Sequence, residues 1–412
     1  MRFFSQFSLC GTLLASVSLA APLAAESSST PAPALSLGQS QSQSLTQSVA
    51  SDSTLDQFAP ASNRRSHHID YAYWDEALAW FVIPMGPSIR QGAPRVDAST
   101  GTRRIYGHES RYRLEGNRVA FSFLTPQIKQ SITEYRADLE RVGSELDITS
   151  LPRNEQLAYW INLHNVAVIE ALAGEYPLAE PSARSFGAEA TELDDAKLVT
   201  VAGVTLSPRD IRERIVYPNW RDPKVIYGFW RGTIDGPSIQ RLAYTGGNVD
   251  ALLSLSGEEF VNSLRGVERW GGSLRVSEIY DEAAPFFFSD SDALRAHLSQ
   301  YARDDVRELV ARTQAVAYKN AEGDLADLAR GERDPAILYT CQQEGGAAGG
   351  RAGGVNAGSC RPLRSRPNLA VQRLMQERAE KLRRARARGI RSGMVIYGDG
   401  SYSEQETPPE VE

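Results

Sequence analysis

The stretch from Asp222 to Asn248, DPKVIYGFWRGTIDGPSIQRLAYTGGN, has the layout of a reaction centre without the atoms that usually react. The apolar run from Val225 to Phe229 predicts a strand, and the Gly, Asp and Pro residues after it predict a turn, where catalytic side chains often lie. The stretch contains no Cys, His or Glu. Arg231 and Asp235 are therefore the charged pair whose chemistry has to be considered first.

Arg231 and Asp235 fall on one predicted turn, and two interpretations are open. They form an internal ion pair that holds the turn, or Arg231 forms an anion pocket together with Trp230 and with His164 and Asn165 from elsewhere in the chain. The planar guanidinium group suits a carboxylate or a phosphate because it donates two parallel hydrogen bonds.

A second group of polar residues lies in NEQLAYWINLHNVAVIEALAGEY, from Asn154 to Tyr176. At about 100° per residue, apolar side chains cover this predicted helix nearly all round, which indicates a buried helix. Asn162, His164 and Asn165 then lie in the core, where their polar atoms need partners. They either tie the helix to neighbouring loops or orient a ligand in a cleft.

Composition excludes several classes of function. A net charge of -6 argues against nucleic-acid binding, which requires a basic footprint. We expect no metal and no cofactor, because no set of ligands or Ser/His/Asp triad can be assembled. His67 and His68 are adjacent and project differently, so they make a poor chelate.

The first residues predict export. Residues 1–25 have the charged start, apolar run and small-residue end of a signal peptide, with cleavage expected after Ala25. No later segment reaches the roughly 20 apolar residues that cross a bilayer. We therefore expect a periplasmic or secreted protein without a transmembrane span. In that oxidising compartment Cys341 and Cys360 are predicted to form a disulfide, with two separate thiols as the alternative.

The chain divides into segments of different composition. Residues 26–65 are a Ser/Gln/Pro-rich linker, 66–303 an α+β domain, 304–397 a helical extension with a Gly-rich Cys loop, and 398–412 an acidic disordered tail. The domain is expected to be mainly helical around a small mixed or antiparallel sheet. The Arg-dense segment 368–389 is interpreted as a helix lying on its own acidic domain or as a solvated face, with an anionic membrane or partner as the alternative.

Local patterns predict the elements of the domain. Ser207 and Asp210 form a capping box in SPRDIRERIVY, with Pro208 at the first helical position. The other expected elements are helices at 70–82, 127–142 and 248–264, a hairpin at 112–124 around Gly116, a hairpin at 197–207 around Gly203, a strand at 272–280, and one long or two abutting helices at 291–316.

Three motifs in this order resemble one family, domain of unknown function 547. They are LAYWINLHNVAVI (157–169), VTLSPRDIRERIV (204–216), and the opening stretch continued through DALL and FVNSLRGVE. The resemblance covers roughly 71–301. The activity of the family is not established.

The resemblance implies a cysteine site that this chain has lost. Typical members carry a histidine after Asp-Pro, an Asn-Cys-Gly step and a second cysteine, which suggests a papain-like or transglutaminase-like site and a remote relation to that fold. The corresponding positions here are Ile226, Trp230, Arg231 and Gly236. A guanidinium group cannot serve as a nucleophile in place of a thiolate.

We therefore expect a noncatalytic protein rather than an enzyme, which binds a peptide, a glycan, a small anionic ligand or an envelope protein. The predicted binding residues are Asn162, His164, Asn165, Trp230, Arg231 and Asp235. The alternative is an envelope hydrolase or transferase that uses Arg231, Asp235 and His164 without a thiol. A third hypothesis is a structural envelope protein that acts through its tail. An enzyme would expose His164 in a cleft with a carboxylate nearby. A binding protein would show a cleft lined by Trp230 and Arg231 without an acid/base pair, whereas the structural role predicts a packed turn.

Overall fold

In the part of the chain that the structure describes, helices dominate and the sheets have two or three strands, which confirms the α+β class. The computed structural model describes residues 55–61, 66–95, 106–320, 322–332, 339–341, 360–362 and 368–390. The expected signal peptide and acidic tail lie outside these residues, as does most of the linker. Within the described residues, no helix is both long and apolar enough for a membrane span.

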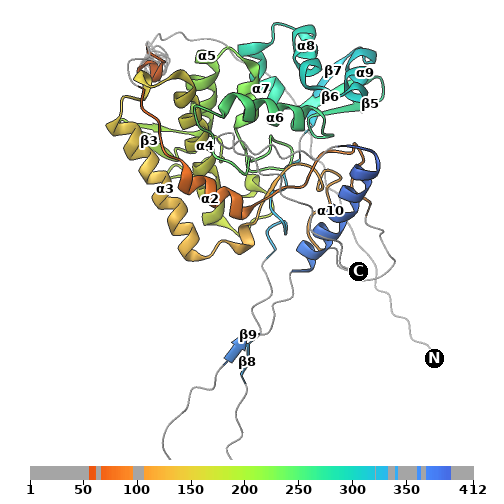
Figure 1. Ribbon diagram of the computed structural model, residues 1–412, viewed down its shortest axis with the longest axis horizontal. Coiled ribbons are helices and arrows are strands. Elements are labelled where there is room, and N and C mark those ends of the chain that lie inside the picture. The colour runs from red at the N-terminus through yellow and green to blue at the C-terminus, as the bar shows by residue number, and fades with distance from the viewer. Residues whose placement is uncertain are drawn as a thin grey trace, which may run out of the picture. The chain divides into compact units, whose positions relative to one another are not determined.

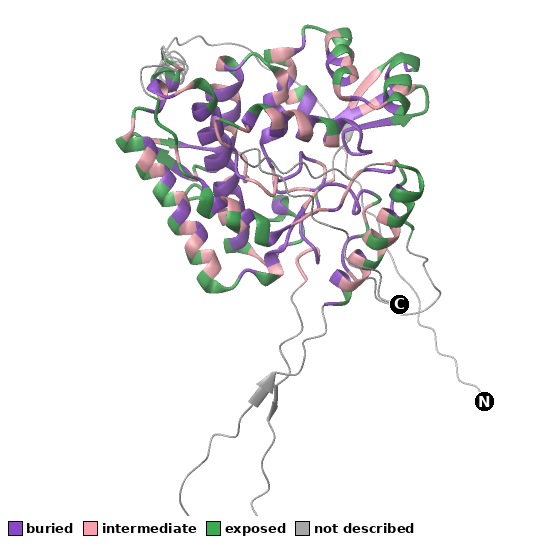
Figure 2. Ribbon diagram, viewed as in Figure 1, coloured by how far each residue is buried: buried purple, intermediate pink, exposed green. Residues whose placement is uncertain are grey.

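Helix α4 (Arg153–Glu175) is the centre of the fold, and its middle turns are buried on every side as the sequence predicted. Helix α3 (Pro126–Glu145) lies against it (Figure 1), with Thr125 as its N-cap and Pro126 at its first position. The α3–α4 contact is close at Gly143, where a hydroxyl from α4 fills the space of a side chain. Figure 2 shows the contrast between the buried α4 and the exposed outer face of α3.

Two predicted elements next to α4 are confirmed. Strands β3 (Val199–Val201) and β4 (Val204–Leu206) form the expected hairpin, and Gly203 takes a positive φ of 80° in its turn. The capping box is also present, because Ser207 N donates to Asp210 Oδ2 at 2.9 Å and Asp210 N donates to Ser207 Oγ at 3.1 Å. The helix that follows widens into the π-helical segment η5 (Asp210–Val216).

The strand expected at Val225 to Phe229 is wrong. These residues lie mostly in a 3₁₀-helix, η6 (Pro223–Gly228), which leads towards α6 (Val249–Val261). The physical reason is at the start of the segment: Asp222 caps the helix by accepting from Lys224 N, and proline occupies the first helical position. A short apolar run alone cannot distinguish the two conformations.

The hairpin expected at 112–124 is also wrong. Strand β2 (Arg118–Val119) pairs with the distant β1 (Val82–Ile83), which directly follows α2 (Ala72–Phe81), rather than with its own neighbour. Gly116 still makes a turn, with a φ of 71°. The pairing depends on tertiary contacts that a local pattern does not contain.

The largest sheet has the order β5 (Val267–Trp270), β6 (Ser273–Ser277) and β7 (Val316–Asn320). Strands β5 and β6 are antiparallel, whereas β6 and β7 are parallel, so the sheet is mixed as predicted. Helix α7 (Ile279–Phe287) follows β6. The folded unit extends beyond residue 303, because β7 belongs to this sheet and Leu325 and Ala326 belong to the main core.

The segment from 291 to 316 contains two helices rather than one. Helices α8 (Ser291–Tyr301) and α9 (Asp304–Arg312) are separated by Ala302 and Arg303, both in extended conformations. Figure 1 shows the two helices beside the β5–β6–β7 sheet.

Helix α10 (Leu369–Ala387) contains the Arg-dense segment and lies on the protein's own surface (Figure 1), as one interpretation of the sequence predicted. Its buried Leu374 packs in a small second core. Arg113 forms a two-pronged ion pair with Glu377, and Lys381 Nζ donates to Leu114 O at 2.6 Å. Burial lowers the pKa of Lys381 to about 8.

Strands β8 (Tyr339–Cys341) and β9 (Cys360–Pro362) form an antiparallel pair whose register places Cys341 opposite Cys360. The side chains of these strands lie outside the described part of the protein. The disulfide between the two residues therefore stays a prediction.

The α3–α4 contact can be tested with Gly143→Ala. The added Cβ would overlap the Tyr159 hydroxyl and lie 2.9 Å from Val201 Cγ1, so we expect a clear loss of thermal stability. Gly174→Ala is the matched control, because nothing lies within 4 Å of a Cβ there and the change should stabilise α4 by up to about 1 kcal/mol. Equal unfolding temperatures for the two variants would contradict the described packing.

Candidate functional site

Asn162 and Asn165 each hold a loop against α4 with both ends of the side-chain amide. Asn162 donates to Tyr244 O at 2.7 Å and accepts from Tyr244 N at 3.1 Å. Asn165 donates to Gly228 O and accepts from Trp230 N, both at 2.9 Å. These four bonds fix η6 and the turn that follows it to the central helix.

His164 lies between Asn165 and a buried arginine. Its Nδ1 is 3.0 Å from Asn165 Oδ1, and its Nε2 is 3.1 Å from Arg212 Nη1. Because the guanidinium group can only donate, Nε2 must accept and the imidazole is neutral. Burial and then the positive charge of Arg212 lower the pKa of His164 to about 3.

Arg212, on η5, is fully buried and joins two carboxylates. It donates to both oxygens of Asp194, with Nη1 at 2.8 Å, and its Nε donates to Glu282 Oε1 at 3.0 Å. Glu282 comes from α7 and also accepts a weak bond from the Tyr217 hydroxyl at 3.3 Å. The guanidinium group of Arg212 thereby links η5, on which it lies, to Asp194 and to α7.

Arg231 completes this cluster through Glu282. Its Nη1 and Nη2 donate to the two oxygens of that carboxylate at 2.6 and 2.7 Å. The ion pair expected between Arg231 and Asp235 is wrong: Asp235 instead accepts from the Thr233 hydroxyl at 2.5 Å and from Glu322 N at 2.8 Å. Arg231 and Asp235 are thus held by different parts of the protein.

We call Asp194, Arg212, Arg231 and Glu282 the ion-pair cluster. Two guanidinium groups face two carboxylates, so their formal charges cancel, as burial of ionised groups requires. Burial alone raises the pKa of Glu282, but Arg231 and Arg212 outweigh it and lower the pKa to about 2. The pKa of Asp194 also lies well below its usual range, because Arg212 outweighs the effect of burial.

Most of the predicted binding residues are closed off from solvent. Asn162, Asn165 and Trp230 are at most 3% exposed and His164 is 0% exposed. Ile226, at the position of the family's histidine, is 1% exposed. The structure brings Asn165, His164 and Trp230 into contact. Arg212 and Glu282 connect them to Arg231. These groups are packed and hydrogen-bonded to one another instead of facing an open cleft.

Sequence reasoning missed Asp194, Arg212 and Glu282. The available signal was Arg212 itself, which shares a helix face with the apolar Ile215 and Val216, three and four residues later, and was therefore a candidate for burial. Its partners could not be identified from the sequence, because they lie 18 and 70 residues away. In the described residues no group of three metal-binding side chains is present.

Two cavities lie elsewhere, and none of the six predicted binding residues lines either of them. One, of about 420 Å³, lies between α6 and the segment joining α8 to α9. The other, of about 220 Å³, lies where Trp220 meets the first turns of α4 and α6. At the second cavity Arg153 stacks over the Trp220 ring, and Lys224 pairs with Asp250.

Part of the chain that forms this site matches a known protein family. Residues 148–261 match the family described as "Protein of unknown function, DUF547". This segment is a DUF547 domain. The match includes α4, η5, η6 and α6, and therefore every predicted binding residue. No curated protein and no solved structure matches the chain, so the papain-like relation stays a prediction.

Within the DUF547 domain, Arg231→Met should destabilise the protein by about 3 kcal/mol, because it leaves part of the partly buried Glu282 carboxylate unpaired. Glu282→Gln should cost at least as much, since two guanidinium groups lose their shared partner. The free energy of unfolding, measured with denaturant, should fall less in the double variant than the sum of the losses in the two single variants. Arg141→Met, which breaks two exposed ion pairs, is the control and should change stability by less than about 1 kcal/mol. Strictly additive effects would contradict the pairing.

The lowered pKa of Glu282 predicts a specific acid response. A carboxylate with a depressed folded-state pKa contributes stability that is present above its unfolded value of 4.5 and is lost as the pH falls towards about 2. Unfolding of the wild-type protein should therefore become easier across this window. Glu282→Gln should show a smaller pH dependence there, and an unchanged slope would contradict the assignment.

Proposed function

We propose that this protein is a noncatalytic DUF547 protein that works by binding in the periplasm or after secretion. The observation that carries the proposal is the two-pronged ion pair between Arg231 and Glu282. Arg231 occupies the position at which the family resemblance places a cysteine, and its guanidinium group is already bound by a carboxylate. A group in this state can neither attack a substrate nor capture a second anion without losing its partner.

The alternative of a hydrolase or transferase at Arg231, Asp235 and His164 has less support. A general base works best with a pKa near the operating pH. His164 has a pKa of about 3, and the nitrogen that would take a proton accepts from Arg212. Asp235, whose pKa is raised by burial, is bonded to Thr233 and Glu322 N instead of facing His164.

Binding at the packed turn also has little support, because Trp230 is buried and Arg231 is paired. The peptide, glycan, small anionic ligand or protein partner expected from the sequence is therefore better accommodated at a surface that still offers unpaired polar groups. This moves the proposed binding function away from the turn but keeps it within the same folded unit.

The state of His164 tests the noncatalytic proposal directly. Side-chain NMR of the exported form, with the His164→Asn variant to assign the signal, should show an imidazole that stays neutral from pH 8 to about pH 4. The nitrogen chemical shift of its Nε2 should be that of an unprotonated nitrogen that accepts a hydrogen bond. Titration of His164 near neutral pH, or turnover of any ester, amide or glycoside that is lost in His164→Asn, would contradict the proposal.

A further inference from the structure

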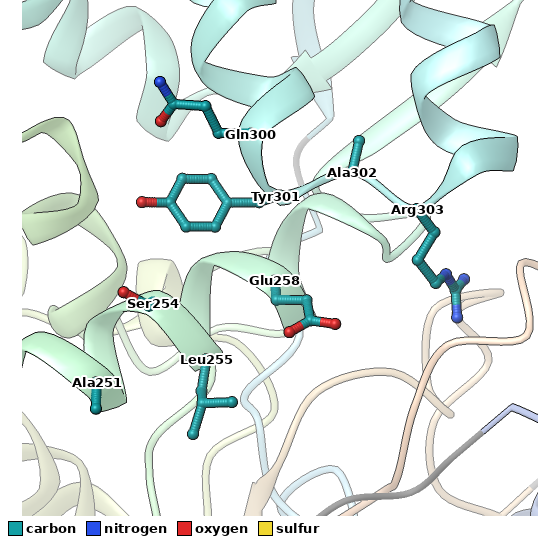
Figure 3. A pocket seen from close by; sticks show the side chains of 8 residues that line it. All are labelled: Ala251, Ser254, Leu255, Glu258, Gln300, Tyr301, Ala302 and Arg303. Atoms are coloured by element: carbon teal, nitrogen blue, oxygen red, sulfur yellow. The ribbon is translucent and has the colours of Figure 1, made fainter.

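The larger cavity is a groove between α6 and the chain from α8 to α9 (Figure 3). Its volume of about 420 Å³ lies in the range of about 300–1,000 Å³ that small-molecule sites occupy. Its lining residues come from two walls. One wall provides Ala251, Ser254, Leu255 and Glu258, and the other Gln300, Tyr301, Ala302 and Arg303.

Asn262 fixes the two walls to each other. Its amide nitrogen donates to Glu258 O at 2.7 Å and to Tyr301 O at 2.8 Å, and its oxygen accepts from Arg303 N at 2.7 Å. Asn262 is 4% exposed. The groove is therefore shaped before a ligand arrives, which reduces the entropy that binding would cost.

Tyr301 closes one end of the groove against α6. Its ring contacts those of Tyr227 and His297, with centroids 5.8 and 5.3 Å away. The close approach depends on Gly257, where a Cβ would lie 3.2 Å from Tyr301 Cδ1 and 2.9 Å from the Tyr227 ring. The hydroxyl of Tyr301 lies above Ser254 in Figure 3, so both are placed to hydrogen-bond a ligand.

The walls carry opposite charges that do not neutralise each other. The exposed carboxylate of Glu258 makes no ion pair or hydrogen bond with the described residues, and Figure 3 shows it across the groove from the guanidinium group of Arg303. Arg303 donates through Nη1 to Ser88 O at 3.1 Å and forms a long ion pair with the exposed Asp305, whose Oδ1 lies 3.7 Å from Arg303 Nε. An exposed pair of this length contributes little, so a ligand carboxylate can replace Asp305 at low cost. Leu255 and Ala251 on α6, with Ala302 on the opposite wall, provide the apolar part of the lining, and in Figure 3 Glu258 lies between Leu255 and Arg303.

We propose that this groove binds a small molecule carrying both an ammonium and a carboxylate group beside an apolar side chain. The ammonium group pairs with Glu258, the carboxylate with Arg303, and the apolar side chain lies on Leu255. Free α-amino acids and short peptides share this chemistry, and Ser254, Gln300 and Tyr301 can hydrogen-bond the amide of the latter. The inference rests on the binding part of the proposed function.

Isothermal titration calorimetry of the exported form with L-leucine and Leu-Leu tests the proposal. N-acetyl-leucine lacks the ammonium group and leucinamide lacks the carboxylate, so each should bind about tenfold more weakly than L-leucine or not at all. Tighter binding of Leu-Leu than of L-leucine would identify peptides as the source of this chemistry, and the reverse would identify free amino acids.

The Glu258→Gln variant locates the ammonium group. It removes an exposed, unpaired charge and should therefore leave the unfolding temperature unchanged. The affinity for L-leucine and for Leu-Leu should fall about tenfold, and L-leucine should no longer bind more tightly than N-acetyl-leucine. Asp292→Asn, an equal charge change at an exposed position of α8, is the matched control and should leave binding unchanged.

Three results would overturn the inference: no heat of binding from L-leucine and Leu-Leu at millimolar concentration, equal binding of the blocked derivatives, or equal effects of Glu258→Gln and Asp292→Asn. None of them would affect the noncatalytic part of the proposed function, which depends on the state of His164. If turnover depended on His164 while leucine bound at Glu258, the noncatalytic proposal would be rejected, but the inference of a ligand site in the groove would stand.

Discussion

The shared contact of Arg212 and Arg231 with Glu282 is the interaction on which the rest of the site depends. It joins η5, the turn after η6 and α7 at one partly buried carboxylate. Each ionised group in such a place needs a partner, because loss of hydration is otherwise not compensated. The same contact sets the state of His164, whose Nε2 faces a guanidinium group held in place by its carboxylates.

This arrangement separates two kinds of polar surface in one protein. In the interior, the cations are paired with anions, and the amides of Asn162 and Asn165 each donate and accept a hydrogen bond within the protein. Few polar groups are therefore left to bind a ligand. At the α6 groove, by contrast, Glu258 and Arg303 are fixed on opposite walls by Asn262 while their charges remain apart. The interior therefore accounts for stability, and the groove is the site that we propose for binding.

Features set by local sequence were predictable, and those set by distant contacts were not. The burial of α4, the Ser207–Asp210 capping box and the turn at Gly203 follow from side-chain periodicity, caps and turn chemistry over a few residues. For Arg231, however, the only carboxylate partner that the local sequence suggested was its neighbour Asp235. Its real partner lies 51 residues away, on a helix whose position depends on the whole fold.

Chemical modification of arginine by phenylglyoxal, mapped by mass spectrometry, measures whether the guanidinium groups of Arg231 and Arg212 are held by their carboxylates. Both should remain unmodified in the native protein while the exposed Arg221 reacts, and all three should react after unfolding. Modification of native Arg231 at the rate of Arg221 would show a free guanidinium group. That result would contradict the closed ion-pair cluster and restore the turn as a binding site.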